Sequence, residues 1–256
     1  MILRRLAQNL RDENWTAIFI EFVLLVLGVF LGIQVANWNE DRQDRIREQE
    51  YLERLGREVA EILPEVRETA ESLAHRRALI ESLRDYLATG KGLESLDRSH
   101  CNAAGRSHIY AATIFYPPTI KELIATGNIL LIRDPAIKTA ILSFDQAHAD
   151  RSQLRTDIQI DRWVLARHYP QLINSGLATN WADSSCDFEG MRNDPAFRND
   201  FADNLRRHLA YVASLGEQQL ASLEALAAAI SPTLAGLDRS SPVGVPAPAA
   251  DEGSEP

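Results

Sequence analysis

The first of three hydrophobic patterns along the chain is an almost uncharged run near the N-terminus. Residues 16–36 read TAIFIEFVLLVLGVFLGIQVA and hold a single charged side chain, Glu21. A helix of this length spans about 30 Å, the thickness of the hydrocarbon layer of a membrane. Trp15 and Trp38 flank the run, where aromatic rings suit the two membrane interfaces. The pattern predicts a transmembrane helix over residues 16–38 with Trp15 and Trp38 as interface anchors.

A buried core helix and a cleavable signal peptide are the two alternatives for this run. Core helices seldom extend so far without a polar face. A signal peptide would have a shorter apolar stretch, and the leader here carries Asp12 and Glu13. The sequence before residue 37 is also a poor match to a small-x-small cleavage site. We therefore expect an uncleaved single-pass signal anchor.

Small residues and one acid lie on one stripe of the predicted membrane helix. Gly28, Gly32 and Ala36 follow one another at four-residue spacing, which allows two helix backbones to approach closely. At about 100° per residue, Glu21 points within roughly 20° of the glycines. The stripe therefore predicts packing against a second copy, with Glu21 at the contact. The alternative is that Glu21, near the start of the run, reaches back to the headgroups.

The second pattern is a seam of positions alternately three and four residues apart, beyond the membrane segment. Nine of its eleven positions are apolar, and the two exceptions are Thr69 and Arg76. Pro64 interrupts the run and predicts a kink or a new helix start. The seam predicts a long stalk helix that enters a helical bundle. Its positions are Leu52, Leu55, Val59, Ile62, Val66, Thr69, Leu73, Arg76, Ile80, Leu83 and Leu87.

The third pattern is a set of amphipathic helices with strong start signals. Thr119 followed by Glu122 matches a capping box. Asp134 and Asp194 are each followed by proline, which suits an N-cap and a first helical position. Residues 90–118 have no clear pattern, and a short strand or a helix fits them equally. The expected helices cover about residues 119–126, 135–168 before Pro170, and 195–230 before Pro232.

These patterns predict a mainly α fold in which a transmembrane helix continues into a long stalk helix and a helical bundle domain. From Ser240 onward, proline, alanine and acids dominate, so a disordered C-terminal tail is expected. The expected division is a short cytoplasmic N-terminus over 1–15, the transmembrane helix over 16–38, a helical soluble domain of coiled-coil or bundle type over 39–238, and the tail over 239–256.

Charge and motifs narrow the class of function. The chain has 36 acidic and 27 basic residues and no basic block, which gives no electrostatic reason to bind nucleic acid. It has no Gly-rich phosphate loop, HExxH, GxSxG or CxxC. Asp157 and Asp161 share a helix face, but Arg155 and Arg162 beside them favour a solvated ion-pair surface. We expect a protein that is not an enzyme, with no catalytic residue, cofactor or metal.

The two cysteines, Cys101 and Cys186, allow three interpretations. An isolated pair fits one disulfide in an oxidising compartment, which is the interpretation we favour. Closing so long a loop would stabilise the fold by roughly 4 to 5 kcal/mol in the chain-entropy model. Two free buried thiols are the second interpretation. A metal site that also uses His100 and His108 is the third, although its spacing matches no common zinc pattern.

The orientation of the anchor is not decided by the arginines on its two sides, because they balance. The N-terminal amine adds one positive charge to the short side, and a long domain is translocated largely regardless of its charges. We therefore expect a bacterial inner-membrane protein with a cytoplasmic N-terminus and a periplasmic domain. The balanced arginines are Arg4, Arg5 and Arg11 before the anchor and Arg42, Arg45 and Arg47 after it.

Three stretches together resemble a known family: GVFLGIQVANWNE at 28–40, FYPPTIKELIATG at 115–127 and CDFEGMRNDPAF at 186–197. The resemblance is to an uncharacterised family of bacterial single-pass membrane proteins, a domain of unknown function. Its hydrophobic N-terminal helix ends in Gln-x-x-Asn-Trp-Asn. In this chain that ending is formed by Gln34, Asn37, Trp38 and Asn39.

The resemblance covers nearly the whole chain before Ser240 and implies a membrane anchor. It also implies that Cys101 and Cys186 belong together, and Glu21 resembles an acidic position in the helix of the family. It implies no activity, substrate or catalytic residue.

The function expected from the sequence is that of an extracytoplasmic interaction, scaffold or sensor module tethered to the lipid bilayer. We expect a homo-oligomer formed through the transmembrane helix and stalk, and a protein or small ligand as the unidentified partner. One alternative is a membrane-tethered helical adaptor that faces the cytoplasm. The other is a membrane-tethered enzyme of unidentified type.

Overall fold

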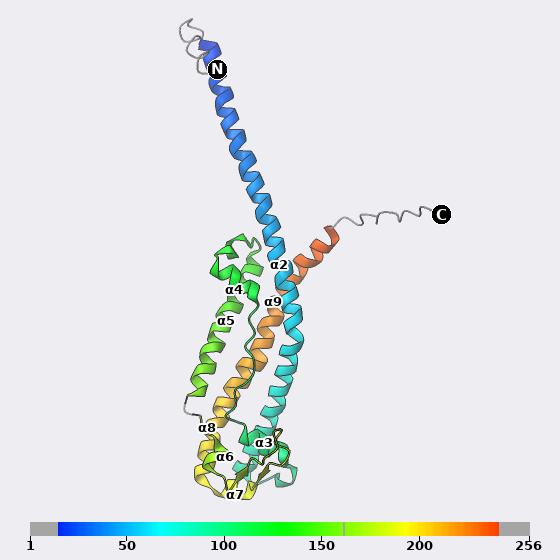
Figure 1. Cartoon of the computed structure of the whole chain (residues 1–256), viewed down its shortest axis with the longest axis vertical. Coiled ribbons are helices and arrows are strands. Elements are labelled where there is room, and N and C mark those ends of the chain that lie inside the picture. The colour runs from blue at the N-terminus through cyan, green and yellow to red at the C-terminus, as the bar shows by residue number, and fades with distance from the viewer. Residues whose placement is uncertain (1–14, 161, 241–256) are drawn as a thin grey trace, which may run out of the picture. The chain divides into compact units, whose positions relative to one another are not determined.

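The computed structural model describes residues 15–160 and 162–240, and the predicted mainly α fold is confirmed (Figure 1). The predicted disordered tail beyond residue 240 and the predicted cytoplasmic segment before Trp15 lie outside the described residues. The elements are α2 (Trp15–Thr89), η1 (Leu93–Ser95), α3 (Arg98–Gly105), α4 (Pro118–Ala125), η2 (Asn128–Leu131), α5 (Pro135–Gln159), α6 (Leu165–His168), β1 (Ile173–Asn174), β2 (Ser185–Cys186), α7 (Phe188–Asn193), α8 (Pro195–Val212), the π-helical segment η3 (Ala213–Gln218) and α9 (Gln219–Ser240).

The chain divides into two compact units, Met1–Tyr51 and Leu52–Pro256, and α2 contributes to both. The first unit contains the predicted membrane segment. Thirteen large hydrophobic side chains between Phe19 and Trp38 are 48% to 67% exposed there. This part of α2 is long and apolar enough to cross a membrane.

The second unit is a helical bundle built on the seam of α2. Eight of the nine apolar seam positions are buried, and Ile62, Thr69 and Arg76 are half-buried. Figure 1 shows α5, α9 and the later part of α2 lying side by side, with α3, α6 and α7 gathered at one end of the bundle. Each buried leucine or valine contributes about 1.5–3 kcal/mol. The seam is therefore covered by helices of the same chain.

Two of the three predicted helix starts are confirmed, and the third has a different cap. Asp134 accepts a hydrogen bond from the main chain at the start of α5, and Asp194 does so at the start of α8. At α4, however, Thr119 is not the N-cap. Its N–H and its hydroxyl both donate to the carboxylate of Glu58 on α2, at 3.0 and 2.7 Å. A residue 61 positions away thus supplies the cap that the capping box was expected to supply.

The predicted helix over 135–168 is confirmed at its start but is not continuous, because α5 ends at Gln159 and α6 begins only at Leu165. Side chains of α8 hold the main chain in this gap. Arg207 donates to the carbonyl of Ile160 at 2.7 Å, and Asn204 donates to the carbonyl of Trp163 at 2.8 Å. These bonds satisfy main-chain groups that a continuous helix would satisfy internally.

The prolines break fewer helices than the sequence suggested. Pro64 lies inside α2, with buried seam residues on both sides, and Pro232 lies inside α9, which continues to Ser240. Conversely, the helix predicted over 195–230 is interrupted without a proline by η3. A proline inside a helix removes one hydrogen bond and crowds the carbonyl four residues before it, and packing on either side can offset this cost.

Candidate functional site

The predicted cysteine pair is joined in the structure by a disulfide between Cys101 on α3 and Cys186 on β2. The side chain of His100 hydrogen-bonds Asp97 at the start of α3. Across residues 15–160 and 162–240, no three His, Cys, Asp or Glu side chains come together in a way that could hold a metal ion.

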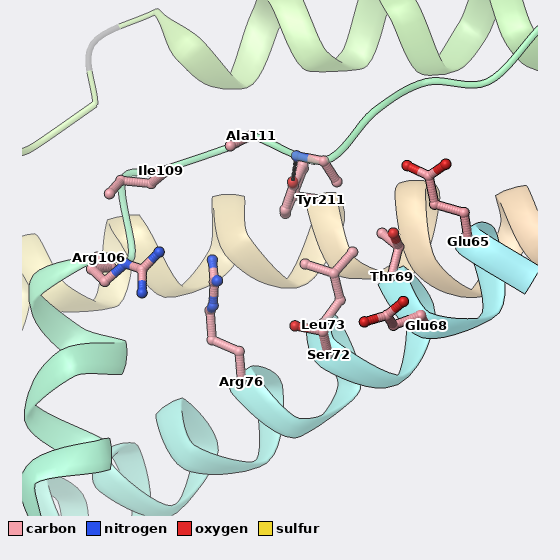
Figure 2. A pocket seen from close by; sticks show the side chains of 11 residues that line it. Glu65, Glu68, Thr69, Ser72, Leu73, Arg76, Arg106, Ile109, Ala111 and Tyr211 are labelled. Carbon is pink, nitrogen blue, oxygen red and sulfur yellow. Dashed lines mark hydrogen bonds between the residues drawn. The ribbon is translucent and has the colours of Figure 1, made fainter. Parts of the chain in front are cut away.

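A hollow of about 380 Å³ in the second unit is the strongest candidate for a binding site (Figure 2). Three segments form it: α2, the C-terminal end of α3 with the extended residues after it, and α8. Figure 2 shows two arginines facing one another at one end and two glutamates at the other. The lining residues are Glu65, Glu68, Thr69, Ser72, Leu73, Arg76, Arg106, Ile109, Ala111, Ala112 and Tyr211.

The arginine end of the hollow brings two positive charges together. Arg76 comes from the seam of α2, and Arg106 is the C-cap residue of α3. Burial, and then the charge of Arg106, lower the pKa of Arg76 from its usual value. The Nε of Arg106 is buried and has no hydrogen-bond partner among the residues that the structure describes. A second hollow of about 200 Å³ shares both arginines and Ser72, so the pair borders two cavities.

A buried histidine is close enough to Arg76 to feel its charge. His208 on α8 is fully buried. Burial, and then the positive charge of Arg76, lower the pKa of His208 to about 4. The ring is therefore uncharged at neutral pH and leaves the two arginines as the positive groups of this end.

An extended segment over residues 109–117 forms one wall of the hollow, and α8 and α9 hold it in place. The N–H of Ala112 donates to the hydroxyl of Tyr211 at 2.6 Å. Gln219 accepts from the N–H of Phe115 and donates to the carbonyl of Thr113, both at 3.1 Å. Tyr211 and Gln219 lie on either side of the π-helical η3, and π-helical turns are frequent at functional sites.

The predicted membrane-helix residues belong to the first unit, whereas the residues that line the hollow belong to the second. Glu21 is half-buried, and its Oε2 has no hydrogen-bond partner within the part of the chain that the structure describes. A Cβ added at Gly28 or Gly32 would meet nothing within 4 Å. Ala36 and Trp38 are exposed, and Trp15 begins α2. In a single chain, no other side chain therefore covers the helix surface at Gly28 and Gly32.

Sequence reasoning missed the hollow, although one signal pointed to it. Thr69 and Arg76, the two polar positions of the seam, both line it. No local pattern marks Arg106 or Tyr211. Of the two aspartates expected on one helix face, Asp157 accepts a hydrogen bond from Gln153, and Asp161 lies outside the described residues.

Comparisons with known proteins identify no relative of this chain. No family model, no curated protein and no solved structure matches the chain.

Proposed function

We propose that the protein is a membrane-anchored binding module that presents its helical domain on the extracytoplasmic side of a bacterial inner membrane. The observation that carries the proposal is the exposure of the apolar part of α2. Thirteen large hydrophobic side chains from Phe19 to Trp38 are exposed on this one helix. Exposed apolar surface on this scale is typical of a segment that contacts lipid or another protein.

Energetics favour the bilayer as the environment of this segment. Phenylalanine, isoleucine, leucine and valine each gain roughly 0.3–0.6 kcal/mol on insertion, so the twelve exposed ones together outweigh the cost of about 3 kcal/mol for one central acid. Glu21 lies near the start of the segment, where its cost is smaller. A single span is therefore favourable even with its charge.

The disulfide supports the extracytoplasmic side. Cys101 and Cys186 are the only cysteines of the chain, and disulfides persist in oxidising compartments such as the periplasm. The hollow beside Arg76 and Arg106 is large enough for a small ligand, which favours a sensor or receptor role. Homodimerisation would use the membrane stripe formed by Glu21, Gly28, Gly32 and Ala36, because the seam of α2 is already covered within the chain.

Fusions of topology reporters test the proposal. Alkaline phosphatase joined after residue 240 should be active, and a cytoplasmic fluorescent reporter at the same position should be dark. A matched control carries the same reporters on a chain that lacks residues 16–38, in which alkaline phosphatase should be inactive. The opposite reporter pattern in the full chain would support the cytoplasm-facing adaptor and contradict the proposal.

A further inference from the structure

We propose that the hollow lined by Arg76 and Arg106 binds an elongated zwitterion, with its oxyanion between the two arginines and its ammonium group near Glu65 and Glu68. This inference rests on the proposed binding function and names the chemical class of the ligand. Each end of the hollow and the wall between them contribute an independent observation.

The arginine end lacks a counter-charge of its own. Among the described residues, neither Arg76 nor Arg106 forms an ion pair with a carboxylate, whereas their neighbour Arg77 pairs with Glu81 and Glu217. Two guanidinium groups that face each other in a half-buried site repel, and a bound oxyanion relieves this repulsion. Guanidinium groups also match carboxylate and phosphate oxygens in a two-pronged geometry. The geometry at this end therefore fits an oxyanion.

The glutamate end has the opposite charge, and its two carboxylates are exposed. In the described part of the chain, no basic side chain pairs with Glu65 or Glu68, whereas Arg67 between them pairs with Glu224 at 2.9 Å. Eight positions separate Glu68 from Arg76 on the same helix, which corresponds to about 12 Å along its axis. A ligand that satisfies both ends must therefore be elongated and must carry its charges at opposite ends.

The wall between the two ends suits an uncharged chain. Leu73, Ile109, Ala111 and Ala112 give this part of the hollow an apolar surface, and Thr69 and Ser72 add two hydroxyls. The volume of about 380 Å³ is within the range of small-molecule sites. A methylene or short peptide chain between the charges would contact this wall.

Calorimetric titration of the full chain, in uncharged detergent and phosphate-free buffer, tests the inference. The probe is ω-aminooctanoate, with four comparison probes: its N-acetyl form, its carboxamide, the much shorter ω-aminopropanoate, and inorganic phosphate. We expect ω-aminooctanoate to bind more tightly than each of its three modified or shortened forms, by roughly 10-fold or more. Equal affinity of the N-acetyl form, or no binding of ω-aminooctanoate, would overturn the inference.

Variants assign the two ends. Arg76→Gln and Arg106→Gln should each weaken ω-aminooctanoate by roughly 10- to 100-fold, whereas the matched control Arg77→Gln should bind as the wild type does. Glu68→Gln should weaken ω-aminooctanoate to the level of its N-acetyl form and leave the affinity for phosphate unchanged. If both arginine variants melt at the wild-type temperature and keep wild-type affinity, the assignment is wrong.

The membrane topology and the zwitterion site are tested by independent experiments. Binding in micelles does not depend on which side of the membrane the domain occupies, and the reporter fusions do not depend on a ligand. Active alkaline phosphatase with no binding of ω-aminooctanoate would overturn the zwitterion site alone.

Discussion

Acidification should destabilise the domain through one buried histidine, His208. Burial and the charge of Arg76 lower its pKa to about 4, whereas a histidine in an unfolded chain titrates near 6.5. Because the folded pKa is the lower one, the unfolded state takes up the proton first as the pH falls. The stability is therefore complete above about pH 6.5 and is lost progressively between there and about pH 4.

The size of this loss follows from the two pKa values. Linkage between protonation and folding gives a loss of roughly 2 kcal/mol at about pH 5 and roughly 3 kcal/mol near pH 4. Such losses are a large part of the stability of an ordinary domain, roughly 5–15 kcal/mol. Burial also lowers the pKa of His108 and His148, so both add pH dependence of the same sign.

The contribution of His208 is isolated by comparing the wild type with His208→Leu, which keeps the other histidines. Denaturant unfolding of the full chain in uncharged detergent, followed by tryptophan fluorescence, gives the free energy of unfolding at each pH. The difference between the two proteins should change by roughly 2 kcal/mol between about pH 7 and about pH 5. His75→Gln, at an exposed position of α2, is the matched control. A difference that stays constant over this range would refute the reasoning.

Four further changes have expected outcomes. Replacing Cys101 and Cys186 with alanine should lower the free energy of unfolding by up to about 4–5 kcal/mol, because the disulfide closes a long loop; an unchanged value would contradict a stabilising bond. Arg151→Met should raise the melting temperature, since the buried Nε and Nη2 of Arg151 have no hydrogen-bond partner among the described residues and only Nη1 donates, to Ser222 at 3.2 Å; a lower one would show that the guanidinium stabilises the fold. Glu58→Ala should lower the free energy of unfolding by about 1–2 kcal/mol, because it removes the cap of α4; a neutral effect would exclude that capping role. Glu21→Gln should reduce the yield of crosslinked dimer in membranes; an unchanged yield would remove the charge from the dimer contact.

Local patterns predicted those parts of the fold that depend on local physics. The seam of α2 has the spacing of one helix face, and Asp134 and Asp194 cap helices whose first turns adjoin them. The failures have tertiary causes. The cap of α4 comes from Glu58, and the gap after α5 is held by Arg207 and Asn204 of α8, far along the chain.

The hollow shows the same limit. Arg76 was visible as a polar residue in an apolar seam, which is a signal for a half-buried charge. Its partner Arg106 comes from the C-cap of α3 and the wall residue Tyr211 from α8, so tertiary packing brings both to Arg76 on α2. The spacing of residues along the sequence does not predict that arrangement.

The central claim, a membrane-tethered domain in an oxidising compartment, is tested most directly by counting free thiols. Cells that express the full chain are lysed in denaturant with a maleimide-polyethylene glycol reagent, which adds one mass step per free cysteine. The chain has only Cys101 and Cys186, so the number of steps is unambiguous, and Cys186→Ala is the one-step control. The account predicts no step before reduction and two steps after it. Two steps before reduction would contradict it.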